Sequence, residues 1–147
     1  MNTTIATLLK QKSGAVHQVP VAVTAAEAVR SMIQHKVGSV LVMDGERLAG
    51  IFTERDVLRR VVGGQLDPVT TPVAAVMTSE VLTVDPTLTV QQALDLFTEK
   101  RFRHLPVMLD GRVVGLISIG DVSRWVASLH RAEAESLRQY ISGGFNP

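Results

Sequence analysis

The chain has 147 residues, and its 15 basic and 14 acidic side chains leave a formal net charge of +1, without the basic excess typical of a nucleic-acid-binding domain. Apolar residues make up 46% of the chain and the mean hydropathy is +0.21, which for a chain of this size indicates that part of its surface contacts another subunit. The absence of cysteine excludes disulfides, thiolate nucleophiles and cysteine-ligated zinc. No apolar run is long enough for a signal peptide or a membrane span, so we expect a cytoplasmic protein without a membrane partner.

The first half of the chain predicts helices separated by short extended segments. A helix is expected over Thr3–Lys12, and the extended segment Val16–Val23 follows it, with Pro20 favouring the edge of a sheet. A second helix is expected over Ala25–Lys36, with Gly38 just beyond it, because apolar residues recur there at helical spacing. Two strands of a hairpin, a helix and a linker are then expected at Ser39–Met43, Leu48–Phe52, Asp56–Val62 and Gln65–Pro72.

The second half predicts the same order of elements. An extended segment is expected at Val81–Val84, and a helix follows the cap residue Thr89. A hairpin with strands at Leu105–Leu109 and Val113–Ile117 leads to a last helix that begins at Asp121.

Positions 24–57 match positions 89–122 at a constant offset of 65 residues and without a gap. The identical pairs include Thr24 with Thr89 and Asp56 with Asp121. The chain is therefore an internal duplication of a β-α-β-β-α unit. Each unit is too small to bury its apolar sheet face alone, so the two copies should pack face to face with approximate two-fold symmetry.

The C-terminal segment Arg131–Ile141 has no counterpart in the first half. Its apolar residues are spaced for a helix with charged residues between them. Such a helix either folds back on the domain or contacts a second subunit, and the sequence does not choose between the two.

Each repeat ends in a predicted buried strand, a hydroxyl residue and an acid three residues later. These residues are Thr53 and Asp56 in the first repeat, and Ser118 and Asp121 in the second. One interpretation is a capping box, in which the hydroxyl and the acid bond to backbone N–H groups at the start of a helix. The other is a nucleoside site, in which the carboxylate accepts both hydroxyl groups of a ribose.

The duplicated unit, with each copy ending Gly-apolar-apolar-Thr/Ser-x-x-Asp, resembles a tandem pair of cystathionine-β-synthase (CBS) domains, often called a Bateman module. The resemblance covers roughly residues 10–130. It implies an α+β fold in which two β-α-β-β-α repeats pack sheet to sheet. The expected division is 1–70 for the N-terminal segment and first repeat, 71–130 for the second repeat, and 131–147 for a C-terminal helix and tail.

The resemblance also implies clefts that bind an adenosine-containing ligand: AMP, ADP or ATP, and in some members S-adenosylmethionine or a dinucleotide such as NAD. It assigns the ribose to Asp56 and Asp121, together with the hydroxyl residues Thr53 and Ser118. The positions that it assigns to adenine are Lys12, Ser13, Gly14, Val37, Met77, Thr78, Ser79 and Phe102.

The resemblance assigns the phosphates to a basic pair, Arg103 and His104, which precedes the strand Leu105–Leu109. The first repeat has Gly38 and Ser39 at the corresponding positions, so the phosphate side is asymmetric. Arg55, in the first turn after Thr53, either reaches a phosphate from the same groove or is a surface charge.

No catalytic centre is predicted. The four histidines lack metal-ligand spacing, and the chain contains no P-loop, nucleophile elbow or dinucleotide fingerprint. We therefore expect a stand-alone regulatory module without catalytic residues, a metal site or a catalytic cofactor. Its expected partners are the adenosine-containing small molecule, a second copy of the chain and a regulated protein, with no nucleic acid. The alternatives are a structural dimerisation module with degenerate clefts and an enzyme that uses the same clefts.

Overall fold

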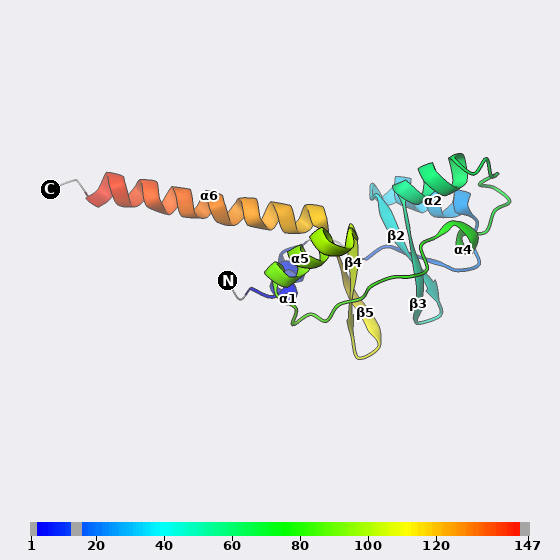
Figure 1. The fold of residues 1–147 in the computed structure, drawn as a ribbon, viewed down its shortest axis with the longest axis horizontal. Coiled ribbons are helices and arrows are strands. Elements are labelled where there is room, and N and C mark those ends of the chain that lie inside the picture. Colours follow the sequence, from blue (N-terminus) through cyan, green and yellow to red (C-terminus); the bar gives the residue numbers. More distant parts are fainter. Residues whose placement is uncertain (1–2, 13–15, 145–147) are drawn as a thin grey trace. The chain divides into compact units, whose positions relative to one another are not determined.

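The computed structural model describes residues 3–12 and 16–144 of the chain (Figure 1). The predicted adenine positions Ser13 and Gly14 lie outside the described residues. The chain divides into two compact units that we call unit 1 and unit 2. Unit 1 comprises Met1–Ser13, Pro86–His104 and Ile117–Pro147, and unit 2 comprises Gly14–Asp85 and Leu105–Leu116. The division of the chain at residues 70 and 130 stays a prediction.

Unit 2 contains a three-stranded sheet and the helix α2 (Ala25–His35). The strands are β1 (Gln18–Pro20), β2 (Ser39–Asp44) and β3 (Arg47–Thr53), in the order β1-β2-β3. β1 pairs parallel to β2, and β2 pairs antiparallel to β3. Pro20 therefore lies in an edge strand as predicted, where its missing N–H disturbs no inner ladder.

Both ends of α2 are closed by local contacts. The hydroxyl of Thr24 accepts from the backbone N–H of Glu27, which confirms Thr24 as the N-cap. The helix ends at His35, and the left-handed residue after it is Lys36, with φ +56°, instead of a glycine. Its counterpart 65 residues later, Arg101, is also left-handed with φ +58°. The repeats therefore share the backbone conformation of this helix end, although neither has glycine there.

The helix predicted over Asp56–Val62 begins two residues earlier and is not a regular α-helix. A short helix α3 (Glu54–Asp56) leads directly into the π-helical segment η1 (Val57–Val62). A further helix, α4 (Val73–Val76), was missed by the sequence analysis. Val73 and Val76 are fully buried, and their spacing of three residues after a proline was the available signal.

The second repeat has a shorter sheet than the first. Its hairpin consists of β4 (His104–Leu109) and β5 (Arg112–Ser118), as predicted. The expected extended segment Val81–Val84 contributes one parallel bridge, between Val84 and Val107, instead of a strand. In the first repeat Val19 pairs in parallel with Val42, so the two pairings occupy matching positions of the duplication.

Within unit 2 the two hairpins share an apolar cluster. Leu41, Met43 and Ile51 from the first hairpin are buried, and Val113 and Leu116 from β5 pack against them. Burial of this apolar surface is the main force that holds the two hairpins together. The predicted α+β fold with sheet-to-sheet packing is thus confirmed. A larger cluster lies on the helical side of the first sheet and consists of Val19, Ala25, Ala28, Met32, Val40, Val42, Phe52, Val61, Val73 and Val76.

Unit 1 is helical. It contains α1 (Ile5–Gln11), α5 (Val90–Lys100) and α6 (Ile119–Gly144), and both α1 and α5 contact α6 (Figure 1). The last helix and the C-terminal helix predicted separately are one continuous helix, which begins at Ile119 instead of Asp121.

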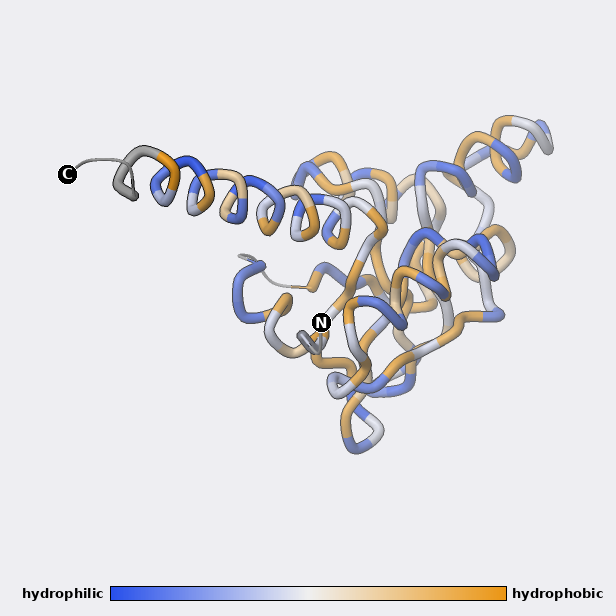
Figure 2. Tube along the Cα trace, turned by 60° about the vertical axis from the view of Figure 1, so that its left-hand side comes forward, coloured by the Kyte–Doolittle hydropathy of each residue, from blue (hydrophilic) through white to orange (hydrophobic). Residues whose placement is uncertain are grey.

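The C-terminal part of α6 is exposed throughout residues 130–141. Leu137, Tyr140 and Ile141 are 60%, 76% and 51% exposed. Hydrophobic and hydrophilic residues alternate along the helix (Figure 2). The alternative in which this helix folds back on the domain is therefore not what the structure shows.

Replacing Gly50 with alanine should lower the free energy of unfolding by about 2 kcal/mol, because the added methyl group overpacks a close backbone approach. A Cβ atom at Gly50 would lie 2.6 Å from the carbonyl oxygen of Thr78 and 2.7 Å from Sδ of Met77. Urea denaturation followed by circular dichroism would measure the loss.

The matched control is Gly120→Ala in the first turn of α6. A Cβ atom there meets its nearest neighbours, Nη1 of Arg124 and Oγ of Ser118, at 3.4 and 3.5 Å. Alanine is also the better helix former. An equal loss of stability in both variants would contradict the assignment of Gly50 as a close-approach residue.

Candidate ligand-binding site

The motif of the first repeat forms a capping box at the junction of β3 and α3. The hydroxyl of Thr53 accepts from the backbone N–H of Asp56 at 3.3 Å. In return, Oδ2 of Asp56 accepts from the backbone N–H of Thr53 at 3.0 Å and from its hydroxyl at 3.2 Å. Asp56 is 6% exposed. The local structure therefore matches the capping-box interpretation. The box uses only one of the two carboxylate oxygens of Asp56, Oδ2.

The other oxygen of Asp56 is held by Thr78, near the start of the second repeat, and by Arg60 on η1. Thr78 and Ile51 exchange two backbone hydrogen bonds of 2.9 Å, which fix the segment around Thr78 against β3. The hydroxyl of Thr78 then donates to Oδ1 of Asp56 at 3.1 Å. Nε of Arg60 lies 3.7 Å from the same oxygen, and its Nη1 donates to the carbonyl of Met77 at 2.6 Å. Sequence reasoning missed Arg60, although its position four residues after Asp56 on a helix was a signal.

The motif of the second repeat has the same box but a different set of donors. The backbone N–H of Ser118 donates to Oδ2 of Asp121 at 2.9 Å, and the N–H of Asp121 donates to the Ser118 hydroxyl at 3.1 Å. Nζ of Lys12, at the end of α1, donates to Oδ2 at 2.9 Å. Nη2 of Arg124, one turn along α6, donates to Oδ1 at 2.6 Å. Two cations therefore flank Asp121, and Arg124 was not among the predicted residues.

These contacts set the protonation of Asp121. Burial acts to raise the pKa of its carboxyl group, but the hydrogen bonds from Lys12 and from Ser118, with the positive charge of Lys12, outweigh burial and lower the pKa below its usual value. Asp121 is therefore a carboxylate at neutral pH, which is the form that accepts hydrogen bonds.

A hollow of about 390 Å³ lies beside Asp121 within unit 1. Its lining combines charged and polar residues with Leu8 and the half-buried Trp125. The residues that line it are Leu8, Gln11, Lys12, Asp121, Arg124, Trp125 and Ser128.

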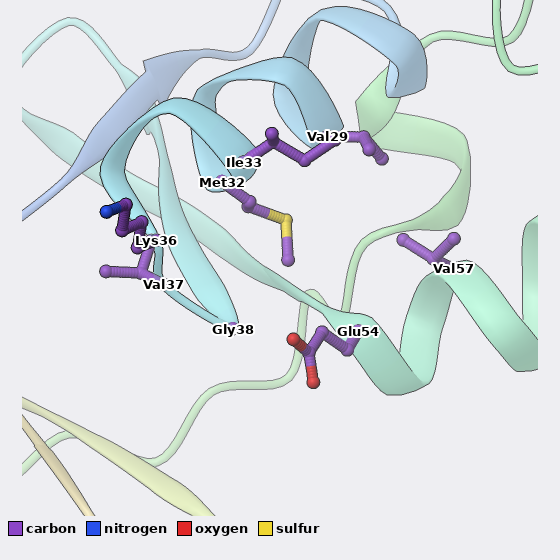
Figure 3. A pocket seen from close by; sticks show the side chains of 8 residues that line it. All are labelled: Val29, Met32, Ile33, Lys36, Val37, Gly38, Glu54 and Val57. Atoms are coloured by element: carbon purple, nitrogen blue, oxygen red, sulfur yellow. The ribbon is translucent and has the colours of Figure 1, made fainter.

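A second hollow of about 380 Å³ lies within unit 2 and is mainly apolar. Figure 3 shows side chains of α2, the following loop and the start of α3 and η1 around a common space. Val37, predicted to contact adenine, lines this hollow. The others are Val29, Met32, Ile33, Lys36, Gly38, Glu54 and Val57.

The remaining predicted residues have varied positions. Phe102 and His104 are half-buried, and Arg103 is exposed. The carbonyl of Arg103 accepts from the N–H of Ile119 at 3.0 Å, so the main chain of the basic pair lies at the start of α6, next to the Ser118–Asp121 box. Met77 is half-buried, whereas Arg55 and Ser79 are exposed.

The structure thus joins residues from opposite halves of the chain. Lys12, from the first half, contacts the acid of the second repeat, and Thr78, which follows the first repeat, contacts the acid of the first. Within residues 3–12 and 16–144, no group of three or more histidine, aspartate or glutamate side chains is arranged to hold a metal ion.

The family model for the CBS domain matches the chain twice, at residues 15–63 and 73–128. The chain belongs to the CBS-domain family. The mitochondrial CBS domain-containing protein CBSX3 of Arabidopsis thaliana is 45% identical over 127 residues, which cover 83% of this chain and 62% of the plant protein. This CBS-domain protein therefore spans less than two thirds of that relative's length.

Two solved CBS-domain structures are similar to this one. A protein from Burkholderia ambifaria MC40-6 with a proposed role in signal transduction is 38% identical, with a TM-score of 0.82 over 86% of this chain and 95% of the other. The CBS domain protein PAE2072 from Pyrobaculum aerophilum, solved in complex with AMP, is 26% identical, with a TM-score of 0.70 over 80% and 88% of the two chains.

Proposed function

We propose that this CBS-domain protein is a stand-alone regulatory module that binds an adenosine-containing ligand. The observation that carries the proposal is the Asp121 carboxylate, ionised and bordering a hollow of about 390 Å³ between two cationic side chains. A carboxylate accepts both hydroxyl groups of a ribose, and cations bind the phosphates. The Pyrobaculum relative in complex with AMP supports this ligand class. AMP, ADP and ATP are the first candidates, followed by NAD and S-adenosylmethionine.

The residue roles in this proposal follow the sequence-based assignment. Asp56 and Asp121, with Thr53 and Ser118, bind ribose. Arg103, His104 and Arg55 contact phosphate. The adenine contacts come from Lys12, Val37, Met77, Thr78, Ser79 and Phe102, together with Ser13 and Gly14.

The module acts by regulation instead of catalysis. The Burkholderia relative has a proposed role in signal transduction, and the other two are named as CBS-domain proteins. Ligand occupancy changes the protein only as far as the ligand prefers one of two conformations or assemblies. We expect the readout to be association with a second copy of the chain or with a regulated protein, without nucleic acid.

None of the described helices is both long enough and apolar enough to cross a membrane. A cytoplasmic location stays a prediction, and the Arabidopsis relative is a mitochondrial protein.

A structural dimerisation module is the second candidate. It is favoured by Asp56, whose two oxygens already accept hydrogen bonds from Thr53 and Thr78. In that case the acids serve only as helix caps, and adenine nucleotides do not bind.

Calorimetric titration with AMP, ATP and NAD separates the candidates. We expect AMP to bind, and Asp121→Ala to weaken its binding by about 100-fold, because two hydrogen bonds to a charged group are lost at about 1.5 kcal/mol each or more. The control is Asp95→Ala on α5, an exposed acid of the same unit that bonds only locally to Gln91. Circular dichroism checks that both variants fold.

Unchanged AMP affinity in Asp121→Ala would refute the assignment of this site. Absence of heat with all three ligands, at protein concentrations of about 100 micromolar, would favour the dimerisation module, since micromolar binding requires roughly 8 kcal/mol. Conversion of a ligand during incubation, seen by chromatography, would show an enzyme.

A further inference from the structure

The donors around Asp121 leave too few acceptor sites for a ribose. An ionised carboxylate offers about four lone-pair sites. Oδ2 accepts from Nζ of Lys12 and from the N–H of Ser118, both at 2.9 Å, and Oδ1 accepts from Nη2 of Arg124 at 2.6 Å. One of the four acceptor sites therefore remains, whereas a ribose diol donates two hydrogen bonds and needs two sites. The Ser118 N–H belongs to the capping box, which leaves Lys12 or Arg124 as the donor that must move.

Both cations are placed where such movement is easy. The Lys12 side chain is 38% exposed and that of Arg124 is 75% exposed, whereas the Asp121 side chain is 10% exposed. Ion pairs with an exposed partner are weak, because water solvates the separated cation well. Lys12 and Arg124 also line the hollow beside Asp121, so either side chain reaches a group bound there by a change of rotamer.

We propose that Lys12 and Arg124 exchange the Asp121 carboxylate for the phosphate of the ligand, so that this hollow selects nucleoside phosphates over nucleosides. This inference rests on the function proposed above. A nucleoside without phosphate must separate a cation from Asp121 and provides no anion in return. A nucleotide provides a phosphate that accepts charge-assisted hydrogen bonds from the displaced cations. Lys12, which the sequence-based assignment gives to adenine, is here a phosphate donor, and Lys12 and Arg124 are thus specificity-determining residues.

Asp56 provides an internal contrast. Its oxygens accept from the N–H and hydroxyl of Thr53 and from the hydroxyl of Thr78, and the nearest nitrogen of Arg60 is 3.7 Å away. Arg60 donates to the carbonyl of Met77 at 2.6 Å. The hydrogen bonds to Asp56 therefore come from neutral donors, with the Arg60 cation at 3.7 Å, whereas two cations donate hydrogen bonds directly to Asp121. The proposed exchange therefore concerns Asp121.

The test is the ratio of AMP affinity to adenosine affinity, measured by calorimetry in the full chain. We expect wild type to bind AMP at least 30-fold more tightly than adenosine. In Lys12→Met, AMP should bind more weakly and adenosine more tightly, because a phosphate donor is lost and a carboxylate site is released. The ratio should fall at least tenfold, and Arg124→Gln should shift it in the same direction. Lys10→Met, which removes an exposed lysine from the same helix, should leave the ratio unchanged.

Each other result has a defined meaning. If AMP and adenosine bind but Lys12→Met and Arg124→Gln leave their ratio unchanged, the exchange is refuted and the proposed function stands. If both variants lower the affinities for AMP and for adenosine by the same factor, the cations act only by supporting the structure, and the exchange is again refuted. If neither ligand binds wild type at millimolar concentration, both the exchange and the proposed function fail.

Discussion

Asp56→Ala should lower the free energy of unfolding by about 3 kcal/mol, because it removes a helix cap and leaves three half-buried donors without their acceptor. The donors are the N–H and hydroxyl of Thr53 and the hydroxyl of Thr78, at 3.0, 3.2 and 3.1 Å from the carboxylate. Thr78 lies near the start of the second repeat, so the lost contacts also connect the end of β3 to that repeat. Urea denaturation at neutral pH would measure the change.

A double-mutant cycle with Thr78→Val isolates the bond across this junction. Thr78→Val alone should cost about 1 kcal/mol. If Asp56 and Thr78 act through one hydrogen bond, the loss in the double variant should be smaller than the sum of the two single losses by at least about 0.5 kcal/mol. Strict additivity would show that the contact does not contribute, and a loss below about 1 kcal/mol for Asp56→Ala would contradict its structural role.

The homodimer that we propose should dissociate when Ile33 and Leu58 are both replaced by glutamate. Ile33 on α2 is 72% exposed, and Leu58 and Val62, one turn apart on η1, are 66% and 63% exposed. Ile33 also lines the apolar hollow that α2 shares with the start of η1 (Figure 3). Large exposed apolar residues on neighbouring elements are typical of a subunit interface. Light scattering should give twice the 15.9 kDa chain mass for wild type and the chain mass for the variant, since burying charge in an interface is costly.

Val69→Glu is the matched control for this variant, because Val69 is 66% exposed in the linker and should tolerate the charge. Leu137→Glu tests in the same experiment the alternative that the exposed end of α6 contacts the second subunit, and the dimer should stay intact if Ile33 and Leu58 form the interface. A wild-type mass of 15.9 kDa at high concentration would rule out the homodimer. If only Leu137→Glu dissociates the dimer, the interface lies on α6 and not at Ile33 and Leu58.

The duplication was readable because its signals are local and occur twice. The hydroxyls of Thr24 and Thr89 each accept from the N–H three residues later, as predicted for two N-caps. The parallel pairs Val19–Val42 and Val84–Val107 show the same offset in space as in sequence. Capping and hydrophobic periodicity involve residues within one or two turns, so these features follow without knowledge of the chain path.

Other local features were misjudged because neighbouring structure overrides propensity. The end of α2 lies at the left-handed Lys36, where a glycine is the usual residue, and the N–H of Lys36 donates to the carbonyl oxygens of Ile33 and Met32. The segment Val73–Val76 followed a proline-rich linker and was too short to show helical periodicity, yet burial of two valines makes it a helix. The sequence analysis divided the single helix α6 in two, because its exposed C-terminal half has no counterpart in the first repeat.

The acids at the ends of both repeats, the hydroxyls beside them and the family of the chain follow from the order of residues alone. The partners of those acids do not, because they depend on which distant segments the folded chain brings together. Lys12 reaches Asp121 across 109 residues, and Thr78 reaches Asp56 across 22 residues. Cations donate hydrogen bonds to Asp121 and neutral groups from two segments donate those to Asp56, and these two sets of donors come together only when the chain has folded.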